Sequence, residues 1–246
     1  MIEKTISEIR NFLKKSAPQL TKDQKSRMYK ILNSDNPNFV GYGNKHSEIE
    51  KFVRKIHSEF DLSYDNASQI FKRLIKSNIH DEKVTGVFLL NRFKKYFNEE
   101  TVDMIQEVIP GYFDSWAITD TTMIRVVGPY LAKSGNEKLA EKTIKEWSRS
   151  EFLWVRRAAL VILLKIIIVK KEFNSDYVFT LVERMHKDPE EYIHKGIGWL
   201  LKTCSNYEPE IIFEYLVENT RNLSRIILRY ASEKLPKDKR AQILKK

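Results

Sequence analysis

The chain has 246 residues, and 43 Lys and Arg against 33 Asp and Glu give it a formal net charge of +10. This length can bury a core without disulfides, and the one cysteine, Cys204, can neither form an intramolecular bridge nor make a metal site alone. These features exclude a disulfide-stabilised secreted scaffold and make a polyanion such as nucleic acid the leading class of partner.

The sequence shows no sign of export or of membrane insertion. Glu3, Lys4 and Glu8 come too early for the apolar region of a signal peptide. The longest apolar stretch, 158–169, is interrupted by Lys165 and is much shorter than the roughly 20 residues that a spanning helix needs. We therefore expect a cytoplasmic protein without membrane contacts.

Helical spacing of apolar residues runs through most of the chain, with few Gly and Pro residues between the segments. Thr21 and Gln24 form a predicted capping box, Ser150 is a predicted cap, and Asp188 before Pro189 predicts a cap and a first-turn proline. In chain order, the pattern predicts helices over 3–15, 21–33, 45–59, 63–76, 82–96, 99–108, 115–133, 137–148, 151–170, 175–186, 189–204, 208–218 and 222–234.

Segment 33–44 has the strongest loop character, and no low-complexity linker divides the chain. We therefore expect a single domain over 1–246. Its N-terminal helices and loop would cover 1–44, and helix-pair repeats would cover 45–246.

A self-similarity indicates the repeats. Segments 154–160 and 192–198 each carry an aromatic residue, an apolar residue, two basic or imidazole residues and then a small one, at an offset of 38 residues. Asp120 lies 37 residues before Arg157, in another predicted helix. Helix pairs at this period are typical of an α-solenoid, so the expected fold is all-α with HEAT-like helix-pair repeats.

Repeat-related positions of a solenoid align on one face, so Asp120, Arg157 and Lys195 should form a polar row. Trp116 lies four residues before Asp120 and Trp199 four after Lys195, which places an indole beside a charged group on each helix. Such a row could be an ordinary solvated ridge. Exposed indoles on a basic surface instead favour stacking against bases and sugars.

The other two tryptophans, Trp147 and Trp154, are expected in the core, where single tryptophans are common.

Several motifs resemble those of the AlkD-like DNA alkylation-repair glycosylase family, in the same order. They are SWAITD at 115–120, WVRRAA at 154–159 and IGW at 197–199, with weaker similarity in MYK at 28–30 and FVG at 39–41. The resemblance implies that Asp120 is the catalytic carboxylate and that Trp116 and Trp199 pack around the sugar of the lesion. The DNA-binding residues it suggests are Arg157, Lys195, Arg156 and Tyr29.

The implied activity is excision of positively charged alkylated purines, N3-methyladenine and N7-methylguanine, from double-stranded DNA in base excision repair. Such a glycosylase needs no metal or organic cofactor, and the histidines show no ligand spacing. We expect a monomer. Ala117 stands where family members often carry a second carboxylate, which leaves the range of adducts open.

Two functions of other classes remain. A catalytically silent HEAT-like protein could bind the DNA backbone or DNA structure, and a solenoid could serve as a protein-binding scaffold. The charged and aromatic residues of the row favour an enzyme over a scaffold, which would show a continuous apolar groove.

Overall fold

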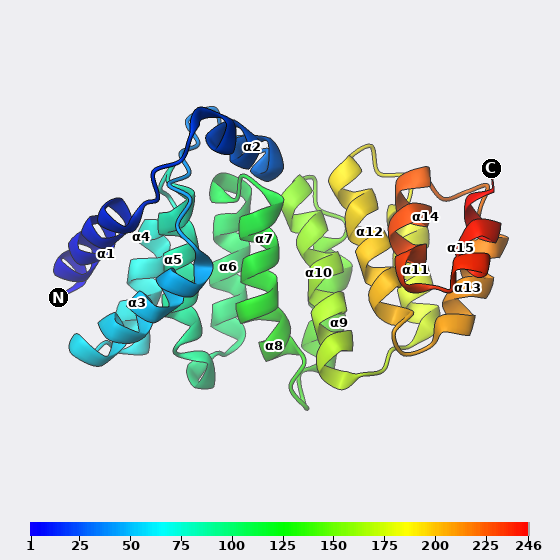
Figure 1. Ribbon diagram of the computed structural model, residues 1–246. Coiled ribbons are helices and arrows are strands. Elements are labelled where there is room, and N and C mark those ends of the chain that lie inside the picture. The colour runs from blue at the N-terminus through cyan, green and yellow to red at the C-terminus, as the bar shows by residue number, and fades with distance from the viewer. Residues whose placement is uncertain (246) are drawn as a thin grey trace. The chain divides into compact units, whose positions relative to one another are not determined.

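The computed structural model describes residues 1–245, and its regular structure is helical (Figure 1). Within these residues, extended pairing is limited to an isolated parallel bridge between Val40 and Ile79. The predicted all-α class is therefore confirmed. The chain divides into two compact units, Met1–Tyr130 and Leu131–Lys246.

Helix α5 forms the centre of the N-terminal unit, where it contacts α1, α3, α4 and α7. All its residues from His80 to Leu90 are buried. The elements of this unit are α1 (Ile2–Ser16), α2 (Lys22–Leu32), α3 (His46–Glu59), α4 (Tyr64–Leu74), α5 (His80–Asn91), a 3₁₀ turn (Lys94–Tyr96), α6 (Glu99–Tyr112), α7 (Trp116–Thr122), a π turn (Met123–Val127) and the start of α8 (Gly128–Leu131).

The first turn of α5 carries two buried carboxylates, Asp81 and Glu82, which form hydrogen bonds within the unit. Both carboxylate oxygens of Glu82 accept from Arg10 Nε at 3.2 Å. The carboxylate of Asp81 accepts the backbone N–H groups of Tyr42 at 2.8 Å and Asn44 at 2.9 Å. Buried charges are costly without partners, and these bonds hold both α1 and the segment after α2 against α5.

The predicted helix 115–133 forms, but it contains a π turn. The backbone N–H of Gly128 donates to the carbonyl of Met123, five residues back, which is the π spacing. One extra residue in a turn rotates the side chains that follow it. Such turns are frequent at functional sites, and this one directly follows the helix that carries Asp120.

The C-terminal unit is a series of helix pairs. Helices α10, α12 and α14 lie side by side, with α9 on α10 and both α11 and α13 on α12 (Figure 1). The elements are α9 (Glu137–Trp147), α10 (Leu153–Lys170), α11 (Ser175–Met185), α12 (Glu191–Cys204), α13 (Pro209–Glu218), α14 (Arg225–Ala231), a 3₁₀ turn (Ser232–Lys234) and α15 (Lys237–Leu244). Paired helices are confirmed in this unit. Helix α12 begins 38 residues after α10, the predicted offset, whereas α14 begins 34 residues after α12.

Two glycines let α12 approach its neighbours closely. A Cβ at Gly196 would lie 3.0 Å from Leu160 Cδ1 of α10, and one at Gly198 would lie 2.4 Å from Tyr230 Cβ of α14. A side chain at Gly198 would therefore force α14 to move.

The predicted helix starts are partly right. The capping box of Thr21 and Gln24 is confirmed, because both reciprocal bonds are present. The predicted cap at Ser150 is wrong: α10 begins at Leu153, and the Ser150 hydroxyl accepts the backbone N–H of Phe152 at 3.2 Å in the preceding turn.

The predicted cap at Asp188 is also wrong, since α12 begins at Glu191, two residues beyond Pro189. Asp188 lies in the turn before the helix, where its Oδ1 accepts the backbone N–H of Glu190 at 3.0 Å. The same carboxylate binds the Nε of Arg156 at 2.6 Å and its Nη2 at 3.3 Å.

The core assignments of the tryptophans are confirmed, because Trp147 is 1% exposed and Trp154 is 5% exposed. Lys165 is half-buried on the otherwise apolar face of α10. The sequence analysis missed α15, which buries Ile243 as its one fully enclosed side chain. No helix within residues 1–245 has the length and apolar character to cross a bilayer.

Candidate active site

The motif at 115–120 forms the start of α7. Ser115 has an extended backbone, and the helix begins at Trp116, so Trp116 and Asp120 stand one turn apart on the same face. The Trp116 side chain is half-buried, whereas Asp120 is 7% exposed. Half-buried Ala117 leaves Asp120 as the carboxylate of this motif.

The ring of Trp116 is fixed by helix α2. Its indole Nε1–H donates to the backbone carbonyl of Ile31 at 3.0 Å. Ile31 is in the last turn of α2, where carbonyl groups have no partner within the helix. The contact therefore satisfies a helix end and sets the orientation of the indole.

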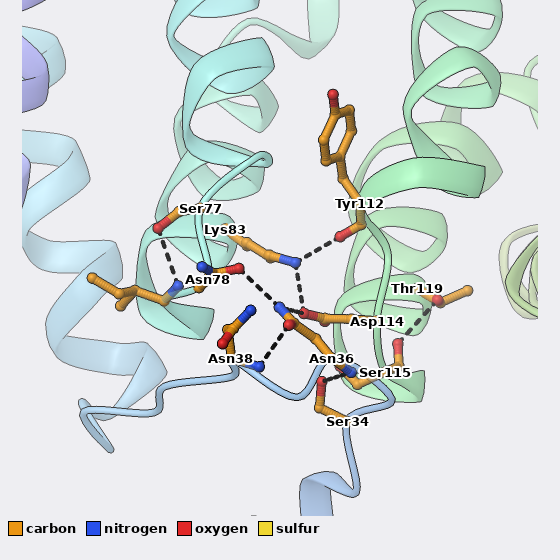
Figure 2. Close-up of polar contacts among 11 residues, drawn as sticks. Ser34, Asn36, Asn38, Ser77, Asn78, Lys83, Tyr112, Asp114, Ser115 and Thr119 are labelled. Carbon is orange, nitrogen blue, oxygen red and sulfur yellow. Dashed lines mark hydrogen bonds and ion pairs between the residues drawn. The ribbon is translucent and has the colours of Figure 1, made fainter.

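A buried ion pair precedes α7 (Figure 2). Lys83 Nζ of α5 lies 2.7 Å from Asp114 Oδ2 and donates to the carbonyl of Tyr112 at 2.6 Å. The side chains of Lys83 and Asp114 are 3% and 7% exposed. Within residues 1–245, the other carboxylate oxygen of Asp114 has no hydrogen-bond partner, so this carboxylate depends on Lys83 for its stabilisation.

Asp114 also holds the segment that follows α2. Its backbone carbonyl accepts the N–H of Asp35 at 2.9 Å, and its Oδ2 accepts from Asn36 Nδ2 at 3.4 Å. Asn36 Nδ2 also donates to Asn78 Oδ1 at 3.0 Å, before α5 (Figure 2). Asp114 therefore joins α2, α5 and the start of α7, which positions Trp116.

Tyr29, predicted to contact DNA, lies inside the N-terminal unit beside the same loop. Its hydroxyl accepts the N–H of Gly41 at 3.3 Å, and its ring meets Phe39 edge-on at 5.3 Å between centroids. These contacts give Tyr29 a supporting position between α2 and the loop. Its contact with DNA stays a prediction.

A cavity of about 370 Å³ lies between α2, the loop after it and α5. His80 in its wall is 8% exposed, and its Nδ1 has no hydrogen-bond partner within residues 1–245. Burial lowers the pKa of His80, against the opposing effect of Asp81, so the imidazole is held neutral near pH 7. The rest of the lining combines apolar side chains, such as Met28 and Ile31, with polar and charged ones, such as Arg27.

In the C-terminal unit, Arg157 is on α10 and is 5% exposed. Its Nη1 donates to the carbonyl of Tyr192 on α12 at 2.6 Å. Lys195 is one turn further along α12, where it forms an ion pair with Glu191 and lies 5.2 Å from the ring of Tyr192. The structure therefore brings Arg157 and Lys195 to adjacent helices, as the repeat predicts.

Trp199 follows Lys195 by four residues on α12 and is half-buried. Arg156 is held by Asp188 and also donates to the carbonyls of Ser150 at 3.0 Å and Glu151 at 2.7 Å. With these partners, Arg156 fastens the start of α10 to the turn before α12. Its predicted contact with DNA is untested.

Trp116, Asp120 and Tyr29 thus lie in the N-terminal unit, and the C-terminal unit holds Trp199 and the cationic residues Arg156, Arg157 and Lys195. Lys83 and Asp114 were not predicted as site residues. The signal that could have revealed Asp114 is its place two residues before Trp116. In residues 1–245, no cluster of side chains has the composition of a metal site.

The four tryptophans should differ in access to solvent. We expect iodide to quench Trp116 and Trp199 and not Trp147 or Trp154, because only the first two are partly exposed. Added duplex DNA should shield the accessible pair. Single Trp→Phe variants assign the quenched fraction, and quenching of Trp147 would contradict its buried position.

Comparison with known proteins places this geometry in context. A family model described as DNA alkylation repair enzyme matches residues 8–235. A search of curated proteins finds no match.

Solved structures resemble the fold. A predicted DNA alkylation repair enzyme from Enterococcus faecalis is 20% identical, with a TM-score of 0.74 over 89% of this chain and 98% of that one. AlkD2 from Streptococcus mutans is 18% identical, with a TM-score of 0.57 over 87% of this chain and 98% of its own. At these identities the likeness concerns the fold alone, and it agrees with the all-α architecture.

Proposed function

Because this chain belongs to the DNA alkylation repair enzyme family, we propose that it is a DNA glycosylase that excises N3- and N7-alkylated purines from duplex DNA. The observation that carries the proposal is the pair on α7, a nearly buried carboxylate one turn from a partly exposed indole, in a chain of net charge +10. A carboxylate is unfavourable for binding phosphates, and it is useful where a sugar becomes cationic.

The proposed chemistry needs little acid catalysis. An N3- or N7-alkylated purine is cationic, so when the glycosidic C–N bond breaks, the base takes the bonding electrons and leaves neutral. Positive charge then develops on the sugar. Asp120 stabilises this charge, and water adds to the anomeric carbon and gives up a proton to the carboxylate.

The other residues bind and orient the substrate in this proposal. The indole of Trp116, held by the carbonyl of Ile31, offers its face to the lesion's sugar. For Trp199 on α12, the resemblance implies the same role. Arg156, Arg157 and Lys195 supply positive charge for the DNA backbone, and Tyr29 contributes a neutral hydroxyl. We further propose that the protein acts as a monomer in the cytoplasm.

The deciding experiment measures base release. Purified protein incubated with methylated duplex DNA is expected to release N3-methyladenine and N7-methylguanine above the spontaneous rate. The products can be separated by chromatography, with protein-free DNA as the background. Tight binding of DNA without base release would favour a catalytically silent DNA-binding protein. Absence of DNA binding would contradict both the glycosylase and the DNA-binding function.

We expect the affinity for duplex DNA to fall steeply with salt. Contacts between cationic side chains and phosphates release counterions, so affinity should drop at least about tenfold between roughly 50 and 200 mM salt. Fluorescence anisotropy of a labelled duplex measures this slope. An affinity that stays constant across this range would show that binding does not depend on phosphates.

A further inference from the structure

A second cationic site lies on the N-terminal unit, outside the residues assigned above. It is a cavity of about 160 Å³ between α3, the end of α5 and the π turn. Its walls include Glu50 and Arg54 from α3, Phe88, Asn91 and Arg92 around the end of α5, and Arg125 from the π turn. The volume suits a small group such as a phosphate rather than a base with its sugar.

Arg125 is held in place at this cavity by two contacts. It forms an ion pair with Glu50, and its guanidinium carbon lies 4.5 Å from the centroid of the Phe88 ring. Together these contacts fix the orientation of the Arg125 guanidinium, and the ion pair neutralises Glu50, the carboxylate of the cavity wall. The side chain of Arg125 remains 37% exposed, so solvent and a ligand can reach it.

The other two arginines leave the cavity positively charged. Arg54 and Arg92 are both exposed, and within residues 1–245 neither forms an ion pair. Neighbouring imidazoles respond to this charge. Burial and Arg92 lower the pKa of His57, and burial and Arg125 lower the pKa of His46.

The cavity is close to the proposed catalytic carboxylate along the chain. Arg125 follows Asp120 by five residues, with α7 running directly into the π turn. At about 1.5 Å per residue, the rise between them is roughly 7 Å.

We propose that this cavity binds a phosphodiester group of the DNA. Arg54 and Arg92 supply positive charge, and Arg125 supplies a guanidinium of fixed orientation. The side-chain amide of Asn91 supplies a neutral hydrogen-bond donor. The inference rests on the proposed function for its ligand. It adds a contact that fixes the register of the strand and reads no base.

The test compares two double variants. Arg54→Gln/Arg92→Gln removes two charges at the cavity, and Lys72→Gln/Arg73→Gln removes two exposed charges on α4, away from it. We expect the cavity variant to bind undamaged duplex about tenfold more weakly at low salt, with the salt slope reduced by about one to two. The α4 variant should lose less than about twofold.

Neutral linkages identify the ligand as a phosphodiester. Duplexes carry a methylphosphonate at one position at a time around the lesion. At one position, the neutral linkage should lower the affinity of the parent protein for the duplex and leave the affinity of the cavity variant unchanged. If the two double variants bind equally, or if every methylphosphonate weakens parent and cavity variant alike, the proposed phosphate site is wrong.

The two proposals fail separately. The cavity is tested by binding alone, on undamaged duplexes and on lesion duplexes with neutral linkages, and neither measurement depends on excision. If the variants show the expected salt slopes of DNA binding but the protein releases no bases, the phosphate site is supported and the glycosylase activity is wrong. If the protein releases bases but both double variants bind DNA equally, the glycosylase activity is supported and the phosphate site is wrong.

Discussion

Asp120→Asn is expected to lower the excision rate at least about tenfold while duplex DNA binds equally or slightly more tightly. The substitution keeps the shape of the side chain and removes its charge. A tenfold loss corresponds to about 1.4 kcal/mol of transition-state stabilisation. Because Asp120 is only 7% exposed, water screens its charge poorly, and the effect on a developing cation is strengthened accordingly.

Single-turnover release of N7-methylguanine measures this effect, after subtraction of spontaneous depurination. Asp103→Asn is the matched control, since it neutralises an exposed carboxylate on α6 of the same unit. That variant should excise at the parental rate. If Asp120→Asn also excises at the parental rate, the carboxylate has a structural role on α7, and the catalytic assignment is wrong.

Lys83→Met is expected to destabilise the protein by about 3–5 kcal/mol, because it leaves Asp114 as a buried carboxylate without its cation. The substitution also removes the donor to the Tyr112 carbonyl. Asp114 cannot recover by hydration, since its side chain is 7% exposed. The orientation of Trp116 should loosen as well, because Asp114 ties α2 and α5 to the start of α7.

Urea unfolding followed by circular dichroism measures the loss. Arg73→Met is the control: it breaks an ion pair with Glu3 in which both side chains are largely exposed, and it should cost about 1 kcal/mol or less. In a second variant, Lys83→Met/Asp114→Leu, both charges are gone, and much of the stability should return. Equal losses from Lys83→Met and Arg73→Met would contradict the importance of the buried pair.

Apolar periodicity predicted most of the helices, since that signal is contained in each segment. It failed for α15, a polar segment that becomes helical by docking Ile243 against the helices before it. It also gave no warning of the π turn. The helix start at Asp188 was predicted wrongly: Asp188 accepts the N–H of Glu190 in the turn before α12 and also pairs with Arg156, 32 residues away, which local capping preferences cannot register.

The candidate site divides in the same way. The spacing of Trp116 and Asp120 on one helical face follows from the sequence alone, because four residues make about one turn. The resemblance to repair enzymes added the role of each residue. The ion pair between Lys83 and Asp114 could not be predicted, because charged residues are expected at the surface. Only the packing of the helices around α5 buries these two side chains.

The sequence by itself determined the helical class, the paired repeats, the cores around Trp147 and Trp154, and the shared face of Trp116 and Asp120. Each of these depends on residues within a turn or a repeat of one another. Only the tertiary structure decided that Asp114 and Lys83 are buried together and that Ile31 holds the Trp116 indole. These pairs join residues 31 and 85 positions apart, and their energies come from exclusion of water by helices that the local sequence does not specify.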